Sequence, residues 1–232
     1  MSESNYNQQA LLEMDARHRA RLINSLSGFK SANLIGTIDK NGRSNLSIVS
    51  SVIHFGANPP LLGFVSRPHS VERHTLENIV ETGCFTINSV DVDIALQSHQ
   101  TSARYTKEES EFDKVDLAPY WIDSFPAPFV LESSIKIGLE LVEHHLVKAN
   151  DTVMVIGEVK HLSLPESAVM PDGYVDIESL DLIALSGLDS YHVTQRLQRL
   201  SYAKPNQMVF PLTLEGDVSS WPEFSKKRMK DR

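Results

Sequence analysis

The sequence predicts a mainly β protein, a closed barrel of antiparallel, Greek-key-like strands with a few peripheral helices. Three observations support this fold class. At least six segments have the alternating or wholly apolar pattern of strands, short hairpin connections join consecutive strands, and few segments have the helical period. A parallel doubly wound sheet would need regular alternation of strands and helices, which this chain lacks.

The first third of the chain predicts two helices and four strands. An imperfect apolar stripe indicates a helix over residues 5–26. In "ANLIGTIDKNGRSNLSIVSSVIHF" two strands are joined at Asn41-Gly42, a strong hairpin signal, and "NPP" ends the second strand. "LLGFVSR" is a short buried strand, residues 71–82 form a helix with Gly83 as its C-cap, and "CFTINSV" is the next strand.

The rest of the chain is less regular until residue 133. Residues 91–129 hold one short helix, "DVDIALQSH", and a charged connection that contains proline. Two long strands, "SSIKIGLELVEHHLV" and "TVMVIGEVKHLSL", then pair across a turn at "KAND", and "LIALSGLDSYHV" adds a last strand or an extended segment. We therefore expect an N-terminal helix in residues 1–26, one domain over residues 27–205, and a partly disordered C-terminal extension over residues 206–232.

Composition argues against several classes of function. The chain has 232 residues and a net charge of −8, so it lacks the excess of Lys and Arg that binding to nucleic acid or an anionic membrane requires. The single cysteine, Cys84, excludes an intrachain disulfide, and its apolar surroundings indicate a buried, inert thiol. The sequence has no signal peptide and no apolar run of about 20 residues, so we expect a cytoplasmic protein.

The sequence gives no support for a metal site, for the common nucleotide-binding motifs or for a hydrolase triad. Nine histidines are scattered without HxxxH or HExxH spacing, and Glu143 to His145 alternate between the two faces of a strand, so we expect no metal site. The motifs GxGxxG, GxxxxGK[ST] and GxSxG are absent. Rossmann or P-loop phosphate binding and Ser-His-Asp hydrolysis therefore have no motif behind them.

The stretch "NLSIVSS", Asn45 to Ser51, begins as a strand with one apolar face and then breaks that pattern. Val49 takes the parity of the polar residues, and Ser50 and Ser51 place two hydroxyls side by side. An amide, three hydroxyls and backbone groups freed as at a bulge suit the polar edges of a ligand.

The stretch "VSRPHSVERHTLENI" is typical of an anion site. Arg67 and Arg73 flank the start of the predicted helix, the hydroxyls of Ser66 and Thr75 are near, and Ser70 is placed as the N-cap. Free N–H groups at a helix N-terminus favour a phosphate there. The alternative is a capped surface helix with two solvated arginines. Together the two stretches suit a planar heterocycle that carries a phosphate, which is the shape and charge of FMN.

The chain resembles the flavin reductase-like family with the FMN-binding split β-barrel, which includes flavoredoxins and flavin:NAD(P)H reductases. The resemblance covers about residues 25–205. It is carried by "SNLSIVSSVIHFGANPPLLGFVSR" and "HTLENIVETGCFTIN", and by "APFVLESSIKIGLEL" and "VIGEVKHL" in the later strands. It implies FMN as cofactor and a homodimer with the flavin near the subunit interface.

The resemblance also implies which residues bind FMN. Asn45 and Ser47 should lie near the polar edge of the ring. The backbone from residue 48 to residue 51 should contact the ring and Ser66, Arg67, Arg73 and Thr75 should hold the phosphate, which gives the set Asn45, Ser47, Ile48, Val49, Ser50, Ser51, Ser66, Arg67, Arg73 and Thr75. Tyr191 and His192 fall where relatives bring polar groups near the ring. The role of His74 stays open, because many relatives read Lys-Asp-Thr where this chain reads Arg73-His74-Thr75.

The expected function is NAD(P)H-dependent flavin reduction by an FMN-binding oxidoreductase. We expect no catalytic side chain, because hydride transfer to a flavin requires no protein acid or base. One alternative is an FMN-binding electron carrier that takes electrons from a protein partner. Another is a split-barrel protein that has lost flavin and acts through its dimer surface. Dependence on nicotinamide separates the first two, and a bound yellow chromophore separates both from the third.

Overall fold

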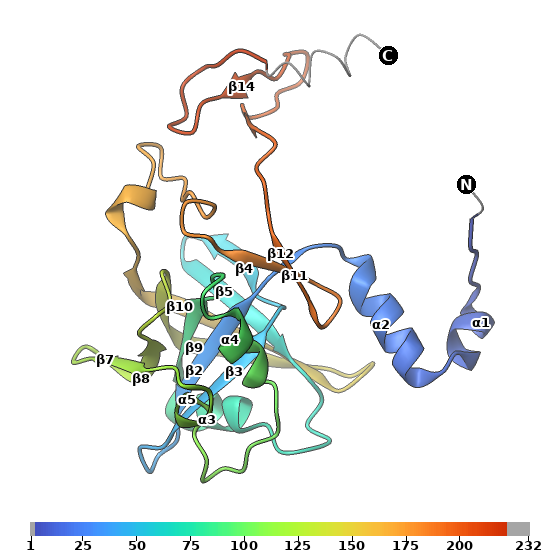
Figure 1. The fold of residues 1–232 in the computed structure, drawn as a ribbon, viewed down its shortest axis with the longest axis vertical. Helices are drawn as coiled ribbons and strands as arrows, with labels where there is room; N and C mark the ends of the chain where they lie inside the picture. Colours follow the sequence, from blue (N-terminus) through green and yellow to red (C-terminus); the bar gives the residue numbers. More distant parts are fainter. Residues whose placement is uncertain (1–2, 222–232) are drawn as a thin grey trace.

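The protein, described over residues 3–221 by a computed structural model, has the predicted mainly β fold (Figure 1). Seven antiparallel strands form its main sheet in the order β3-β2-β6-β9-β10-β5-β4. These strands are β2 (Asn33–Ile38), β3 (Ser44–Val49), β4 (Ile53–Ala57), β5 (Pro60–Ser66), β6 (Cys84–Ser89), β9 (Lys136–Val147) and β10 (Thr152–Ser163).

The sheet is a barrel that is split between β3 and β4. These strands are its two edges, yet only residues 50–52 separate them in the chain. Six gaps between neighbouring strands would make a flat sheet about 29 Å wide. The four Cα–Cα steps from Val49, the end of β3, to Ile53, the start of β4, reach at most about 15 Å. The sheet must therefore curl until β3 and β4 lie near each other. The closed barrel predicted from the sequence thus has a seam where the long second strand breaks.

Smaller elements surround the barrel. Three small sheets are formed by β1 (Lys30–Ser31), β11 (Ile183–Ser186) and β12 (Ser190–Val193), by β7 (Pro119–Ile122) and β8 (Phe125–Val130), and by β13 (Arg199–Leu200) and β14 (Pro211–Leu212). The helices are α1 (Gln8–Glu13), α2 (Ala16–Leu26), α3 (His74–Thr82), α4 (Ala95–Gln100), α5 (Glu111–Val115) and the 3-10 turn η1 (Glu166–Ala168).

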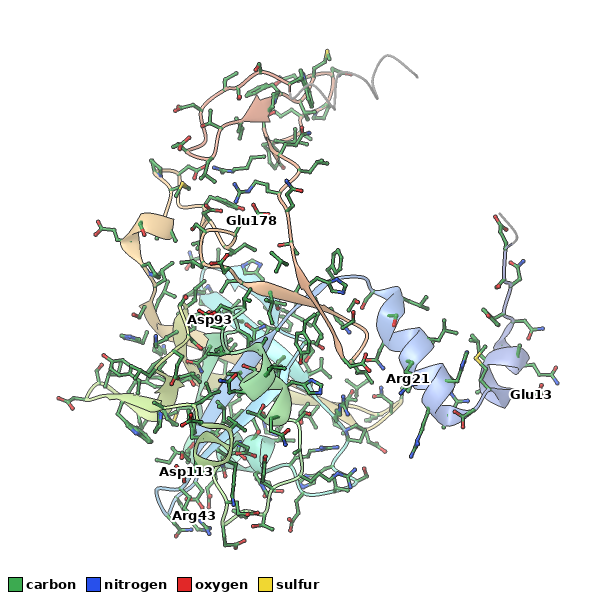
Figure 2. All side chains as sticks on the ribbon, in the orientation of Figure 1. Glu13, Arg21, Arg43, Asp93, Asp113 and Glu178 are labelled. Atoms are coloured by element: carbon green, nitrogen blue, oxygen red, sulfur yellow. The ribbon has the colours of Figure 1, made fainter. Side chains whose placement is uncertain are left out.

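The N-terminal region differs from the single helix predicted over residues 5–26. Met14 is extended, and the Asp15 carboxylate accepts hydrogen bonds from the N–H groups of Arg17 and His18, so a new helix begins at residue 16. No residue of α1 or α2 is buried, and both helices project from the barrel (Figure 1). Figure 2 shows Glu13 and Arg21 on this arm, away from the sheet.

The predicted hairpin at Asn41-Gly42 is confirmed. Gly42 has φ 84°, a conformation that favours glycine, and β2 pairs with β3 in register from Ile38↔Ser44 to Asn33↔Val49. The Asp39 carboxylate accepts from the N–H groups of Asn41 and Arg43 and from Arg43 Nε. Burial opposes its ionisation, but these bonds outweigh burial and lower the pKa of Asp39 to about 2.

Residues 91–129 and the last predicted strand hold more structure than their sequence indicates. In place of one short helix there are α4, α5 and the β7–β8 hairpin. "LIALSGLDSYHV" forms two paired strands, β11 and β12, which turn at Gly187 with φ 61°. The residues predicted as a C-terminal extension include β14, and residues 222–232 lie outside the described part of the chain.

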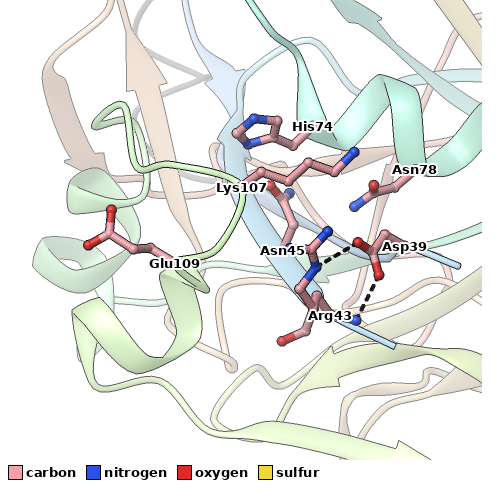
Figure 3. A pocket seen from close by; sticks show the side chains of 8 residues that line it. Asp39, Arg43, Asn45, His74, Asn78, Lys107 and Glu109 are labelled. Atoms are coloured by element: carbon pink, nitrogen blue, oxygen red, sulfur yellow. Dashed lines mark hydrogen bonds and ion pairs between the residues drawn. The ribbon is translucent and has the colours of Figure 1, made fainter. Parts of the chain in front are cut away.

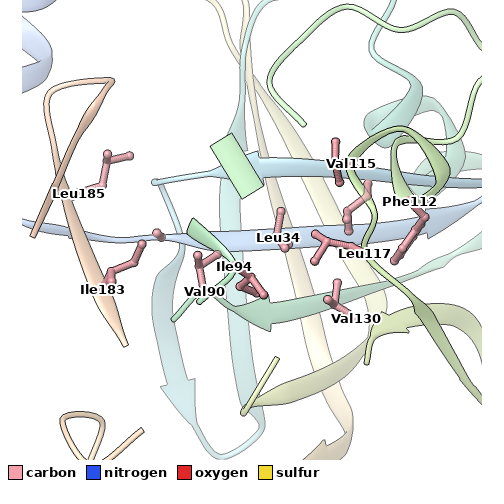
Figure 4. Close-up of a cluster of buried hydrophobic side chains, with 11 residues drawn as sticks. Leu34, Val90, Ile94, Phe112, Val115, Leu117, Val130, Ile183 and Leu185 are labelled. Atoms are coloured by element: carbon pink, nitrogen blue, oxygen red, sulfur yellow. The ribbon is translucent and has the colours of Figure 1, made fainter. Parts of the chain in front are cut away.

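Strand β2 is buried on both faces and divides the core into two main clusters. Leu34 packs on one side with Phe112 of α5 and Ile94 beside α4, and Figure 4 shows this cluster. Ile35 faces the barrel interior and packs with Phe64, Phe85 and other apolar residues. Helix α3 joins this interior cluster through Leu76 and Ile79, so its N-terminus is held firmly beside β3.

Over the described residues, we find no helix that is both long enough and apolar enough to cross a membrane.

Candidate functional site

A cavity of about 500 Å³ opens where β3 ends, facing the end of β5 and the start of α3. All ten residues that the sequence predicted to bind flavin line it, namely Asn45, Ser47, Ile48, Val49, Ser50, Ser51, Ser66, Arg67, Arg73 and Thr75. The fold therefore brings the two informative stretches of the sequence into one site. That each of these residues contacts flavin stays a prediction.

Hydrogen bonds centred on Thr75 join the two stretches. Asn45 Nδ2 donates to Thr75 Oγ1 at 2.9 Å, and the hydroxyls of Ser47 and Thr75 lie 2.9 Å apart. The bond between the two hydroxyls uses one of their two hydrogens. One hydroxyl hydrogen therefore remains to donate to a ligand, whichever way that bond runs. Asn45 and Ser47, which were predicted to lie near the flavin ring, are thus hydrogen-bonded to Thr75, which was predicted to hold the phosphate.

The serines after Val49 explain why the strand pattern breaks. Strand β3 ends at Val49, and Ser51 turns its hydroxyl towards β5. Ser51 Oγ donates to Val65 O at 3.0 Å and accepts from the Val65 N–H at 3.1 Å. It thereby replaces the strand-to-strand bonds that β4 would otherwise make, because the pairing of β4 with β5 stops at Gly63. The hydroxyl of Ser51 thus serves the seam of the barrel.

The start of α3 differs from its prediction. The helix begins at His74, and its N-cap is Arg73, so the assignment of Ser70 as N-cap was wrong. The side chain of Glu77 reaches back and accepts from the Arg73 N–H at 3.1 Å, which replaces a serine cap. The Arg73 side chain is held by its own bond from Nε to Pro68 O at 3.2 Å. Its terminal amino groups are left to bind an anion in the cavity.

Three arginines line the cavity: Arg67, Arg73 and Arg104. None of them forms an ion pair with a carboxylate among residues 3–221. Burial lowers the pKa of Arg73, and the like charges of Arg67 and Arg104 lower it further. Such unpaired positive charge, gathered in an acidic protein, favours an anionic ligand.

Two side chains hold the outer edge of β3. Glu111 Oε2 accepts from the Leu46 N–H at 2.9 Å, and Thr101 Oγ1 accepts from the Ile48 N–H at 2.9 Å. Both side chains line the cavity. Burial raises the pKa of Glu111, and this effect exceeds the opposing effects of its backbone hydrogen bonds and of His74. The carboxyl group of Glu111 in the cavity wall is therefore harder to ionise than an exposed carboxyl group.

Tyr191 lines the cavity as the resemblance implied, whereas His192 does not. The Tyr191 hydroxyl bonds His99 Nδ1 at 2.8 Å, and burial followed by the charge of Asp189 raises the pKa of Tyr191. His192 lies on the alternate face of β12. There its Nε2 bonds the hydroxyl of Ser186 at 2.8 Å, and its ring packs on Phe29.

Sequence reasoning missed several lining residues, chiefly those at the end of α4 and in the loop after it: His99, Thr101, Ser102, Ala103, Arg104 and Tyr105. The run "QTSARYTK" has no motif, and only its local group of hydroxyls with an arginine hints at a site. Asn24 of α2, Leu185 of β11 and Leu188 after that strand also line the cavity, which no local pattern could indicate.

A second, much smaller cavity of about 10 Å³ lies beside the first, below His74 (Figure 3). Asn78 and Lys107 line it together with the Asp39–Arg43 pair. Asn78 Nδ2 donates to Thr37 Oγ1 at 3.1 Å, but the buried Asn78 Oδ1 has no partner in the described chain. The volume holds about one water molecule, which suits that unpaired oxygen.

Other chemistry finds little support in the described residues. Residues 3–221 contain no cluster of three His, Cys, Asp or Glu side chains that could hold a metal ion. Cys84 is a free, buried cysteine, and burial raises the pKa of its thiol, so the thiolate is disfavoured.

Comparison with known proteins identifies similar sequences and folds. The model of the family described as "Flavin reductase like domain" matches residues 26–178. A crystal structure from Shewanella frigidimarina NCIMB 400, described as a flavin reductase with a split barrel domain, is 51% identical with a TM-score of 0.83. That match covers 87% of this chain and 100% of the other.

More distant structures share the fold. Nitrilotriacetate monooxygenase component B from Bacillus cereus is 20% identical, with a TM-score of 0.75 over 86% of this chain and 100% of that one. Flavoredoxin of Desulfovibrio vulgaris (Miyazaki F) is 22% identical, with a TM-score of 0.62 over 77% of this chain and 92% of that one. An uncharacterised protein of Aquifex aeolicus (strain VF5) is 25% identical over 126 residues, 53% of this chain. The match spans 63% of that relative, less than two thirds of its length.

Proposed function

The chain belongs to the flavin reductase like domain family, and from this membership we propose that it is an FMN-binding oxidoreductase that takes hydride from NADH or NADPH. The observation that carries the proposal is the single cavity lined by all ten residues expected to bind FMN. At one end of the cavity lie two arginines without carboxylate partners and a hydroxyl hydrogen without an acceptor.

The residues of the cavity fit a flavin that carries a terminal phosphate. Arg67 and the terminal amino groups of Arg73 supply charge-assisted hydrogen bonds, and Ser66 with the Ser47–Thr75 pair supplies hydroxyls. The first N–H groups of α3 have no partner within the helix and add donors at the same place. Val49, Val65 and Leu188 line the cavity and are only partly buried, so they offer apolar surface for a ring.

A bound flavin would supply the hydride acceptor, and the protein supplies position and exclusion of water. Thr101 and Glu111 fix the outer edge of β3, and Ser51 fixes the seam behind it. The wall of the cavity is therefore set before any ligand enters. Such preorganisation keeps a ligand in one orientation at little cost in entropy. No side chain is assigned as an acid or base.

The proposal is tested by calorimetric titration with FMN and riboflavin, which differ only in the phosphate. We expect wild type to bind FMN more tightly. Arg67→Ala should weaken FMN binding by about 1.5–3 kcal/mol, the range for hydrogen bonds to charged groups, and should leave riboflavin binding nearly unchanged. Lys148→Ala is the matched control, because it removes one exposed positive charge outside the cavity. Equal affinities of wild type for FMN and riboflavin would contradict the phosphate assignment.

Dependence on nicotinamide separates the leading function from the electron carrier. Bleaching of the flavin absorbance on addition of NADH or NADPH under anaerobic conditions is the expected result. Bound flavin that neither nucleotide reduces would favour a carrier supplied by a protein partner. Protein without any affinity for flavin would favour a role through its surface.

We also propose that the protein is a homodimer. Helix α2 has a large apolar side, yet Leu26 is 71% exposed and Leu12 of α1 is 68% exposed. An isolated helix of 11 residues is marginal in water without packing against its apolar face. A second copy of the chain would bury this face, and Asn24 places the same helix at the rim of the cavity.

A further inference from the structure

The third arginine of the cavity, Arg104, comes from a different segment of the chain than the other two, although its charge is near enough to lower the pKa of Arg73. Arg67 directly follows β5 and Arg73 caps α3, so both belong to the segment expected to hold the flavin phosphate. Arg104 comes from the loop between α4 and α5. It is exposed, and no hydrogen bond or ion pair to it is found in the described residues.

The segment from Ser66 to Thr75 suffices for one phosphate monoester. Such a group carries about −1.5 to −2 charges at neutral pH. Arg67 and Arg73 match that charge, and Ser66 with the Ser47–Thr75 pair adds neutral donors. A third guanidinium would then remain without an anion.

The acidic residues of the cavity do not neutralise Arg104. The side chain of Glu72 is 83% exposed and lies 3.4 Å from His74 Nε2. Glu111 is occupied by the Leu46 N–H, and its burial disfavours the charged form. Neither carboxyl group forms an ion pair with Arg104. The positive charge of Arg104 therefore stays available to a ligand.

The loop that carries Arg104 is fixed at its base and exposed at its tip. Thr101 is buried, accepts from the Ile48 N–H and donates to Ser98 O at 2.8 Å. Gln100 Nε2 donates to the Tyr105 hydroxyl at 3.1 Å, which closes the loop. Residues 102–104 between these bonds are exposed at the rim. A ligand that enters after the flavin would meet this rim first.

We propose that Arg104 forms a second anion subsite, separate from that of Arg67 and Arg73, which binds a phosphate of the nicotinamide dinucleotide. The proposal rests on the function proposed above and adds a residue that binds the hydride donor. A dinucleotide offers a pyrophosphate, and NADPH offers a 2′-phosphate as well. Arginine suits either, because its planar guanidinium binds two phosphate oxygens at once.

The test compares Arg104→Ala with Arg67→Ala and Lys148→Ala in two kinds of measurement. Calorimetry gives the Kd of FMN and the Kd of 2′,5′-ADP and of ADP for the FMN-loaded protein. Anaerobic stopped-flow gives the dependence of flavin reduction on NADPH and NADH concentration. We expect Arg104→Ala to leave the Kd of FMN within about twofold and to weaken one adenosine phosphate or both about tenfold, the loss typical of a charge-assisted contact.

Two arms identify which phosphate is bound. If Arg104 binds the 2′-phosphate, the variant loses affinity for 2′,5′-ADP and NADPH and keeps its affinity for ADP and NADH. If it binds the pyrophosphate, the variant loses affinity for ADP, NADH and NADPH alike and loses less for 2′,5′-ADP, which has a single 5′-phosphate in place of the pyrophosphate. Arg104→Lys should recover part of the loss, because it keeps the charge without the planar fork.

Two results would overturn the inference alone. One is an FMN Kd raised as strongly by Arg104→Ala as by Arg67→Ala, which would place Arg104 at the flavin phosphate. The other is a variant that binds and reacts with every nucleotide as wild type does. Wild-type protein that binds no flavin, or whose flavin neither nucleotide reduces, would instead overturn the proposed function and this inference with it.

Discussion

Replacing Ser51 with alanine tests how the barrel is held together at its seam. The Ser51 hydroxyl satisfies both the N–H and the C=O of Val65, at 3.1 and 3.0 Å. Each hydrogen bond contributes about 1 kcal/mol net, so Ser51→Ala should lower the free energy of unfolding by about 2 kcal/mol. In a chain of this size that loss lowers the Tm by about 4–8 °C.

The assay is urea denaturation and calorimetric melting of the flavin-free protein. Ser50→Ala is the matched control, because Ser50 also lines the cavity but its hydroxyl bonds no group in the described chain. Ser51→Thr should retain most of the stability, since it keeps the hydroxyl. If Ser51→Ala unfolds at the same urea concentration as Ser50→Ala, the seam does not depend on this side chain, and our reasoning about the broken strand is refuted.

Three further predictions follow from other sites. Burial raises the pKa of Glu111, so wild type loses stability as pH rises from the unfolded pKa through the folded one. Glu111→Gln should therefore be more stable than wild type by an amount that is near zero at pH 4 and grows towards pH 7, as measured by thermal melting at each pH. A difference in stability that does not depend on pH would contradict this. At Gly63 a Cβ would lie 2.2 Å from Val155 O, so Gly63→Ala should cost about 3 kcal/mol in urea denaturation, while Gly56→Ala, whose Cβ meets only Pro59 O at 3.5 Å, should cost little. Light scattering at micromolar concentration should give about twice 26.0 kDa for wild type and a smaller mass for Leu26→Glu, and a monomeric wild type would exclude the dimer.

The elements that sequence analysis predicted well are those in which local pattern and tertiary packing agree. Strands β9 and β10 alternate strongly, and the hairpin at Gly42 needs a positive φ that glycine supplies. The α3 C-cap at Gly83 has φ 74°, as expected of a glycine that ends a helix. In these places a few neighbouring residues decide the structure.

The misses come from side-chain partners that the local sequence pattern does not reveal, most of them distant in the chain. Ser70 has the chemistry of an N-cap, but Glu77 satisfies the Arg73 N–H, so the helix starts later. Among the site residues, Thr75 was found, but its bonds to Asn45 and Ser47 depend on how α3 packs on β3. Arg104 was missed because only the folded loop brings it to the cavity, and that loop is held in place by the hydrogen bond between Thr101 and Ile48 of β3.

The side chains that hold the outer edge of β3 also protect the protein from unwanted assembly. An exposed edge strand presents unpaired N–H and C=O groups on which another chain can add a strand. Glu111 and Thr101 already accept the hydrogen bonds of the Leu46 and Ile48 N–H groups. The carbonyl groups of an incoming strand would therefore find no free N–H donor at these two positions. Edge-to-edge aggregation through β3 is thereby blocked. Glu111 and Thr101 also line the cavity, so the two side chains that protect this edge form part of the ligand site as well.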